Sequence, residues 1–319
     1  MKKISVAIVT YNHEKYIKQA LDSVLKQKGD FKLEIIVGDD CSKDKTREIL
    51  KKYKEKHKNI KLILNKKNVG VAQNLVNVFN KATGDYIAVL EGDDYWESTR
   101  KLDKQFKFLE THPDYFSCGH DVYVKNQYGE LLTKDIPLLM YHEEYERPKE
   151  LAKYNYYPTL SIMYRNENDI VNKIADATIG AKLCTDYAMK TCFVIEGKAK
   201  ILKDKLGTYR YVVNENSYSS KGLAGVLVGY NDIIFELGNI IDKNPNYKYI
   251  KEIKKDLFYR IRIMILICIK SGNFKKLKEF LKYTRKRYGI GKLISAILLL
   301  PVAVCKYVIL IMSLRKGWK

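Results

Sequence analysis

The sequence lacks the cysteine pairs that mark zinc sites and small disulfide frameworks. No Cys-x-x-Cys pair occurs, and the six cysteines stand singly at positions 41, 118, 184, 192, 268 and 305. We therefore expect free thiols in a reducing compartment. The first residues also lack the apolar region of a secretory signal, because Met1-Lys2-Lys3 leads directly into a strand-like segment. Export is not expected.

Two common phosphate-binding motifs are missing as well. No Gly-x-Gly-x-x-Gly follows the first strand-like segment, and no Gly-x-x-x-x-Gly-Lys-Ser/Thr loop occurs. A dinucleotide-binding domain and a P-loop nucleotidase both lose support. No nucleic-acid recognition motif accompanies the basic residues either, so we expect no nucleic-acid partner.

Acidic residues are scarce relative to basic ones. The 319 residues include 58 Lys and Arg against 37 Asp and Glu, which gives a formal net charge of +21. Such an excess indicates an anionic partner, and a membrane surface or a phosphorylated ligand would both qualify. The length allows one large domain or two smaller ones, each with a core.

The first part of the chain alternates strand-like and helix-like segments. Strand patterns cover residues 4–10, 33–38, 60–64 and 86–90, with helical stripes of apolar residues between them. Asn12 is the expected N-cap of the first helix. This order predicts an α/β, Rossmann-like fold whose mostly parallel central sheet has helices on both faces.

Pairs of aspartates follow two of these strands. Asp39-Asp40 and Asp93-Asp94 should meet at one edge of the sheet, where they would repel unless they met a cation or hydrogen-bond donors. A sugar nucleotide supplies both, since its base carries an N–H and its diphosphate binds a divalent ion. The alternative is an acidic turn, and we expect Ser42 and Asp44 to cap the helix that follows.

The combined motifs resemble the family 2 glycosyltransferases with a GT-A fold, over roughly residues 4 to 215. The segments that carry the resemblance are Val9-Thr10-Tyr11-Asn12, residues 34–46, Asn68-Val69-Gly70 and residues 91–96. Members transfer a sugar from a nucleotide donor, usually with inversion at the anomeric carbon and with Mg²⁺ or Mn²⁺ on the diphosphate. The resemblance therefore implies a nucleotide-sugar donor, with UDP favoured, and a divalent metal cofactor.

The same resemblance implies roles for individual residues. Thr10 and Tyr11 match the wall beside the base, although ordinary packing of the Tyr11 ring is the alternative. Asp40 matches the acceptor of the base N–H, Asp93 faces the ribose and Asp94 binds the metal. The remaining donor contacts would be Asn12, Asn68, Gly70 and Asn74.

The sequence departs from the commonest family pattern in two places. Gln73 stands where many relatives carry an arginine, so a cation near the donor phosphates is replaced by a neutral amide. Val212 stands where a histidine often follows the Tyr-Arg element, so we expect no third metal ligand there. Arg210, within that element, is a candidate for a phosphate contact.

Inverting transfer needs one general base near the acceptor hydroxyl, and the family places a carboxylate at the start of a helix. Asp186 stands at that place and is the expected base; the alternative is a helix acid favoured by the macrodipole. Trp96 and His120 are candidates for acceptor contacts. A metal shared by His120 and Asp121 is not expected, because neighbours on a strand point to opposite faces.

Residues 1–220 form the expected catalytic domain, and residues 221–319 form a helical region. A basic helix at 273–288 precedes an apolar stretch at 293–314 that Pro301 and Lys306 interrupt. This pattern favours peripheral attachment to the inner, anionic face of the cell membrane. The alternative is packing against the catalytic domain or a second copy of the chain, and a bilayer span ranks third because a central lysine is costly.

These observations predict a metal-dependent, inverting glycosyltransferase. Its acceptor would be a saccharide or a lipid-linked saccharide in cell-surface polysaccharide synthesis. One alternative is a sugar-1-phosphate nucleotidyltransferase, although such an enzyme needs a glycine-rich basic loop after the first strand. A noncatalytic, membrane-attached nucleotide-binding module is the other.

Overall fold

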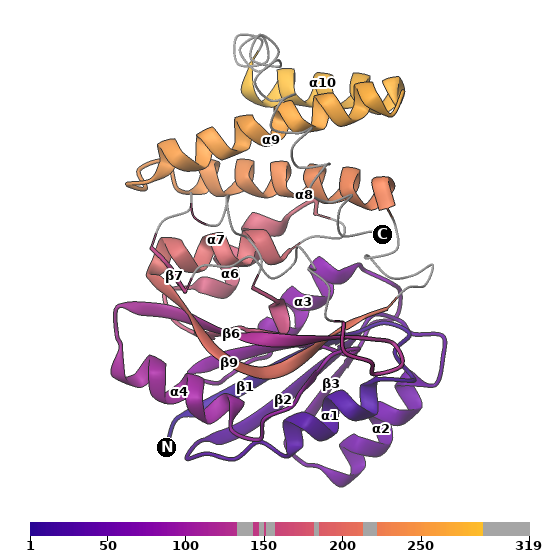
Figure 1. Ribbon diagram of the computed structural model, residues 1–319, viewed down its shortest axis with the longest axis vertical. Coiled ribbons are helices and arrows are strands. Elements are labelled where there is room, and N and C mark those ends of the chain that lie inside the picture. Colours follow the sequence, from indigo (N-terminus) through magenta and orange to yellow (C-terminus); the bar gives the residue numbers. More distant parts are fainter. Residues whose placement is uncertain (133–142, 147–149, 151–156, 182–184, 213–221, 290–319) are drawn as a thin grey trace.

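A nine-stranded mixed sheet forms the centre of the molecule (Figure 1). The computed structural model describes residues 1–132, 143–146, 150, 157–181, 185–212 and 222–289. The strands of the sheet follow the order β3-β2-β1-β4-β8-β6-β9-β5, and β7 pairs with β9.

The N-terminal half of the sheet is parallel, as the alternating pattern predicts. Its strands are β1 (Lys3–Thr10), β2 (Lys32–Asp39), β3 (Ile60–Leu64) and β4 (Tyr86–Glu91). β1 lies between β2 and β4, and every pairing among these four strands is parallel. The predicted α/β fold with a mostly parallel core is therefore confirmed for this half.

The second half of the sheet is largely antiparallel. Its strands are β5 (Tyr95–Trp96), β6 (Tyr115–Asn126), β7 (Glu144–Tyr145), β8 (Met163–Arg165) and β9 (Lys198–Tyr211). β8 is antiparallel to both β4 and β6, whereas β6 and β9 are parallel. β8 is short, because Thr159–Ser161 just before it form a 3₁₀ turn.

Helices cover both faces of the sheet (Figure 1). On the lower face lie α1 (Ile17–Leu25), α2 (Thr46–Lys56) and α4 (Lys101–Thr111). On the upper face lie α3 (Val71–Phe79), α6 (Ile170–Thr178) and α7 (Asp186–Glu196). Alternate residues of each central strand feed the two resulting apolar cores, so Val6 packs below the sheet and Ala7 above it.

The predicted helix cap at Asn12 is wrong. α1 begins only at Ile17, and Asn12 adopts a left-handed conformation with φ of 56°. Its Oδ1 accepts from the Lys43 backbone N–H at 2.8 Å, and its own N–H donates to Ser42 Oγ at 2.9 Å. Asn12 and Ser42 therefore join two loops instead of capping helices.

The expected cap at Asp44 takes another form, because the N-cap of α2 is Lys45 and makes no side-chain cap bond. Asp44 Oδ1 accepts from the backbone N–H of Thr46, the first residue of α2, at 3.0 Å. Its second oxygen accepts from the Glu14 backbone N–H at 2.9 Å. These bonds hold the pKa of Asp44 below its usual value, although burial opposes them.

Three C-terminal helices form further layers above α6 and α7 (Figure 1). They are α8 (Gly222–Lys243), α9 (Ile250–Lys270) and α10 (Phe274–Tyr288). Buried residues of α8 and α9, among them Ile234 and Ile261, belong to the same apolar core as the upper face of the sheet. This part of the helical region thus packs on the catalytic half.

The apolar stretch at 293–314 lies outside the described residues. Within the part of the chain that the structure covers, no helix is long and apolar enough to cross a membrane.

Lys101, at the start of α4, is completely buried. Its Nζ lies 4.0 Å from the centroid of the Trp96 ring and has no hydrogen-bond partner among the described residues. The ring favours an ammonium group, but complete burial without an anion lowers the pKa of Lys101 well below its usual value. The folded protein therefore holds this amine more weakly protonated than the unfolded chain does.

Lys101→Met should stabilise the fold at pH 7 by about 1–3 kcal/mol, because it removes a buried amine without a partner. In the wild type, this lysine should make stability rise as the pH approaches 10.5, since the unfolded chain keeps the proton longer. Urea unfolding at pH 7 and pH 9.5 measures both effects. Lys104→Met, at an exposed position of the same helix, is the matched control and should change little. A strongly destabilised Lys101→Met protein would show that the amine is charged and satisfied.

Candidate active site

The carboxyl ends of three parallel strands meet at one edge of the sheet. Thr10 pairs with Asp39 across β1 and β2, and Val9 pairs with Glu91 across β1 and β4. The loops after β1, β2 and β4 therefore leave the sheet side by side. Crevices at this edge are where open α/β sheets bind ligands.

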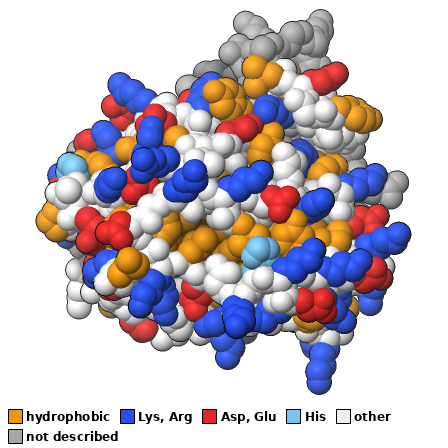
Figure 2. Space-filling model, turned by 90° about the horizontal axis from the view of Figure 1, so that it is seen from below, with side chains coloured by type: hydrophobic (Ala, Val, Ile, Leu, Met, Phe, Trp, Pro, Cys, Tyr) orange, Lys and Arg blue, Asp and Glu red, His pale blue; other side chains and the backbone are white. Residues whose placement is uncertain are grey.

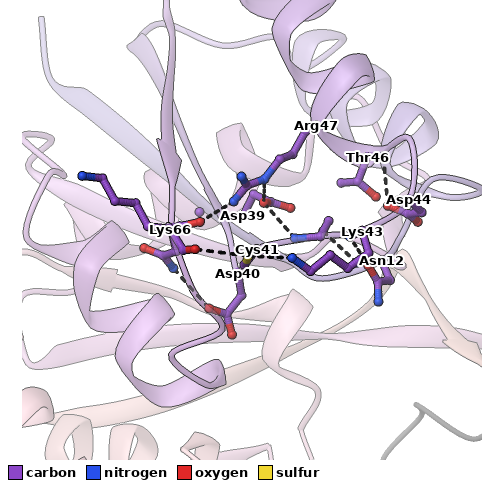
Figure 3. A network of polar contacts seen from close by, with 12 residues as sticks. Asn12, Asp39, Asp40, Cys41, Lys43, Asp44, Thr46, Arg47 and Lys66 are labelled. Atoms are coloured by element: carbon purple, nitrogen blue, oxygen red, sulfur yellow. Dashed lines mark hydrogen bonds and ion pairs between the residues drawn. The ribbon is translucent and has the colours of Figure 1, made fainter.

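The two aspartates after β2 point in opposite directions (Figure 3), as consecutive residues of a strand do. Asp39 is fully buried, forms an ion pair with Arg47 and accepts from the Ser42 backbone N–H at 3.1 Å. Asp39 therefore anchors the start of α2 and takes no part in an open site.

Asp40 holds the loop before α3. Its two carboxylate oxygens accept from the backbone N–H groups of Val69 at 2.7 Å and of Gly70 at 2.9 Å. The side chain amide of Asn65 lies 3.3 Å from one of these oxygens. Asp40 is only 4% exposed, so any contact with a base must use lone pairs that these protein donors leave free.

The other residues expected near the donor divide into exposed and buried ones. Tyr11 is 38% exposed and Asn68 lies on the surface, whereas Thr10 is only 2% exposed. Asn74 is buried, and its amide donates to the Gly38 carbonyl at 2.8 Å. This contact gives Asn74 a structural role between α3 and β2.

Two positions at this edge favour glycine, one for close approach and one for its backbone conformation. A Cβ atom on Gly92 would lie 2.7 Å from Thr10 Oγ1 and 2.9 Å from His13 Nδ1. Gly70 has φ of 86°, a conformation that favours glycine. The loop after β4 is thus packed directly against the loop after β1.

Arg210, near the end of β9, clamps the loop that carries Asp93 and Asp94. Its backbone N–H donates to Asp94 Oδ1 at 2.7 Å, and its guanidinium donates to the Asp93 carbonyl and, at 2.7 Å, to Gln19 Oε1. The guanidinium also lies 4.5 Å from the Tyr16 ring centroid. With 8% exposure, Arg210 positions the aspartates through protein contacts.

Three carboxylates crowd the end of β4. Glu91 Oε2 is buried without a hydrogen-bond partner among the described residues. Burial, then the charges of Asp93 and Asp186, raise the pKa of Glu91 to about 8. Burial, followed by the charges of Asp93 and Glu91, raises the pKa of Asp94 well above its usual value. Ionisation of Glu91 and Asp94 near neutral pH is therefore unfavourable unless a positive charge lies beside them.

Asp186 is the first residue of α7 and lies near Glu91 of this cluster. Its influence on the pKa of Glu91 places the two carboxylates within electrostatic reach. Lys190, one helical turn later and nearly buried, donates from Nζ to Asp186 Oδ2 at 3.1 Å. The Asp186 side chain is 39% exposed, so one face of it is open to a substrate.

Trp96 and His120 lie in the interior. The indole N–H of Trp96 donates to the Leu160 carbonyl at 2.9 Å, and the ring is 3% exposed. His120 is fully buried, its Nδ1 lies 2.8 Å from the Asp121 carbonyl, and burial holds its pKa well below the usual value. Their surroundings favour structural roles over contact with an acceptor.

Three residues of the site were not predicted from the sequence. For Glu91, the sequence signal was its position at the end of a strand, two residues before Asp93. His13 Nε2 lies 3.8 Å from Asp93 Oδ2. For Lys190, the signal was its spacing of four residues from Asp186 on a helix.

The acids after β4 fit a divalent cation. No group of three or more potential ligands is preassembled within the described ranges. Mg²⁺, however, is commonly bound by one or two carboxylates together with substrate phosphates. Asp94, with Asp93 beside it, supplies such a carboxylate, and burial followed by the charges of Asp93 and Glu91 raises the pKa of Asp94.

The family model described as Glycosyl transferase family 2 matches residues 5–169, just over half of the chain. The chain belongs to glycosyl transferase family 2. A Mycobacterium tuberculosis protein of uncharacterized function is 31% identical over 208 residues, which cover 65% of this chain and 58% of that protein. The chain thus spans less than two thirds of that relative.

Two solved structures of glycosyltransferases share the fold. TarS of Staphylococcus aureus in complex with UDP-GlcNAc superposes with a TM-score of 0.55 at 21% identity, covering 83% of this chain and 81% of that one. A mannosyltransferase of Pyrobaculum calidifontis in complex with GDP-Man and Mn²⁺ gives a TM-score of 0.53 at 16% identity, covering 96% and 81%. The expected GT-A fold is confirmed.

Glu91→Gln should stabilise this family 2 protein at pH 8 by about 2 kcal/mol or more. At that pH the folded wild type loses free energy because Glu91 ionises less readily than in the unfolded chain, and glutamine does not ionise. The raised pKa means that the folded state binds a proton that the unfolded chain releases near pH 4.5. Wild-type stability should therefore fall between pH 4.5 and pH 8, and the variant should lose part of that slope. Denaturant unfolding across this range tests it, with the exposed Glu48→Gln as control. Identical slopes for wild type and Glu91→Gln would contradict the assignment.

Proposed function

We propose that this chain is an inverting glycosyltransferase that uses a nucleotide-sugar donor, with UDP favoured. The observation that carries the proposal is the cluster of Glu91, Asp93 and Asp94 facing Asp186 across the carboxyl edge of the sheet. The first three acids suit a diphosphate and its cation. The partly exposed Asp186 suits an acceptor hydroxyl. TarS, with the same fold, binds UDP-GlcNAc.

The donor would lie over the loops after β1, β2 and β4. Tyr11 is exposed beside this edge and offers its ring to the base. Asp93 keeps a partly exposed carboxylate, 31% accessible, for the ribose hydroxyls. The loop held by Asp40 would close the base pocket from the other side.

Asp94 would hold Mg²⁺ or Mn²⁺. When bound, the ion would neutralise charge on the leaving nucleoside diphosphate. The mannosyltransferase of the same fold was solved with GDP-Man and Mn²⁺, which supports a cation at the corresponding edge. Arg210 would keep both aspartates in place through the contacts described above.

Asp186 would act as the general base. The acceptor oxygen forms a bond to the anomeric carbon as its proton passes to the Asp186 carboxylate, and the bond from that carbon to the diphosphate breaks. Attack from the side opposite the leaving group inverts the configuration. Lys190 would orient Asp186 through its contact with Oδ2.

The acceptor would be a saccharide or lipid-linked saccharide of a cell-surface polymer. TarS is a poly(ribitol-phosphate) β-N-acetylglucosaminyltransferase and is 37% identical to this chain over 118 residues, 36% of this chain and 20% of TarS. Attachment to the inner face of the membrane would use α10, where Lys275, Lys278, Lys282, Arg285 and Lys286 are exposed. Pairing of two copies through the C-terminal helices is the alternative use of that surface.

Asp186→Asn should lower transfer by about 10²- to 10⁴-fold while leaving donor binding intact, because it removes a proton acceptor and little volume. Asp94→Asn should abolish both transfer and the cation-dependent part of donor binding. A thermal-shift titration of UDP-sugars with and without Mn²⁺ measures donor binding, and UDP release with an acceptor measures transfer.

Asp30→Asn, at an exposed position before β2, is the control and should match the wild type in both assays. Release of pyrophosphate in place of UDP would identify a nucleotidyltransferase. UDP binding without turnover on any acceptor would identify a noncatalytic module. Full transfer activity in Asp186→Asn would overturn the choice of base.

A further inference from the structure

A cavity of about 420 Å³ lies between α1 and the segment that follows Asp94. One wall is formed by α1 with the residues just before and after it, and the other by residues 95–99. Its volume falls within the range of small-molecule sites, roughly 300–1,000 Å³. None of the residues expected to contact the donor lines it, so the donor does not account for this cavity.

Three lysines line the cavity. Lys15, Lys18 and Lys26 are exposed, and within the described part of the chain none of them forms an ion pair. An exposed lysine keeps its charge at neutral pH. Three unpaired ammonium groups around one hollow therefore make a local positive field that attracts anions.

The acidic residues of the lining do not cancel this field. Glu97 is already paired with Lys125 at 2.7 Å and also accepts from Thr208. Asp22 accepts from the Tyr53 hydroxyl at 2.6 Å and is the one carboxylate in the lining without a described cationic partner. The three lysines thus outnumber it.

The spacing of the lysines suits an extended ligand. Lys18, on α1, and Lys26, its C-cap residue, are eight residues apart, which corresponds to roughly 12 Å along a helix axis. A single phosphate group cannot bridge that distance, whereas a chain with repeated anionic groups can. The face of the molecule that carries α1 shows many Lys and Arg side chains around a band of hydrophobic ones (Figure 2).

The cavity also adjoins the reaction centre. Gln19 and Tyr95 both line it, and both contact Arg210: Gln19 Oε1 accepts from the guanidinium at 2.7 Å, and the Tyr95 ring centroid lies 5.2 Å from it. Arg210 in turn holds Asp93 and Asp94. A chain in the cavity would therefore pass beside the loop that binds the donor.

We infer that this cavity binds the repeated anionic groups of a linear acceptor polymer whose reacting end lies at Asp186. The groups would be phosphodiesters or carboxylates, because lysines recognise both as point charges. A neutral glycan would leave three ammonium groups without partners. The inference rests on the proposed function, since it names the class of acceptor for the same site.

The test compares three fluorescently labelled oligomers of equal length: a polyol phosphate, a polyuronate and a neutral glucan. Anisotropy titrations with the full chain should show binding of at least one of the first two, weakening as salt rises, and weaker or no binding of the glucan. The stronger of the two anionic arms identifies the group. The triple variant Lys15→Gln, Lys18→Gln, Lys26→Gln should lose about tenfold or more in affinity for it.

The control variant neutralises Lys51, Lys52 and Lys54, which are exposed on α2 and do not line the cavity. It carries the same net charge as the test variant and should bind almost as the wild type does. Thermal shifts with UDP-sugars should be equal in all three proteins. If UDP-sugars produced no thermal shift in the wild type, this result would contradict the proposed function independently of the oligomer titrations.

Three results would overturn the inference. The glucan could bind as tightly as the charged oligomers, or the two triple variants could bind a charged oligomer equally. Alternatively, vesicles containing anionic lipid could bind in a manner that depends on Lys15, Lys18 and Lys26 while no oligomer does, which would assign these lysines to a membrane surface.

Discussion

The hydrogen bonds of Arg210 to the loop after β4 link, at the candidate site, two halves of the sheet that differ in topology. The aspartates come from the parallel half, whereas Arg210 comes from β9 and contacts them through both its backbone and its side chain. β5, which follows Asp94 directly, pairs with β9 two and three residues before Arg210. Among the described contacts, the backbone N–H of Arg210 is the hydrogen-bond donor to the Asp94 carboxylate, which is buried at an electrostatic cost.

That cost defines the chemistry of the site. Glu91 and Asp94 are buried close to Asp93, and neither has a full positive charge paired with it. The Arg210 guanidinium donates to the Asp93 carbonyl, and its backbone N–H donates to Asp94 Oδ1. The Lys190 ammonium group donates to Asp186. The protein thus fixes the shape of the acidic cluster without pairing Glu91 or Asp94 with a cationic side chain among the described residues. Carboxyl groups with raised pKa values are typical of functional sites.

The sequence predicted the acidic edge well because local patterns determine it. Apolar runs identify the strands, and the period of apolar residues identifies the buried face of each helix. The acidic residues come directly after the strand runs end. What escaped prediction depends on contacts between distant segments. Asn12 resembles a helix cap, but its partner is the backbone of Lys43 on another loop. Asp40 resembles a ligand group, yet its oxygens accept from Val69 and Gly70.

Trp96 and His120 illustrate the same limit in the antiparallel half. Polar and aromatic residues near a motif suggest a substrate surface, but packing of α4 under β6 and the turn before β8 encloses both side chains. The amine of Lys101 is buried against Trp96. It is also the second cause, after burial, of the lowered pKa of His120. The sequence could not reveal this buried amine, because so many other lysines of the chain are exposed. Burial is a property of the fold, and no local pattern encoded it here.

The helical region beyond residue 221 takes part in holding the candidate base. Tyr187, next to Asp186, donates its hydroxyl to Asp256 of α9 at 2.6 Å, and Arg260 lies 4.4 Å from the Tyr187 ring centroid. Arg260 also pairs with Asp256 at 3.0 Å, so the start of α7 is fastened to α9 by a buried polar network. Because such networks are costly when incomplete, the position of Asp186 depends on helices that the sequence had assigned to a separate region. The division at residue 220 marks a change in composition, whereas the base and its supports are built from both sides of it.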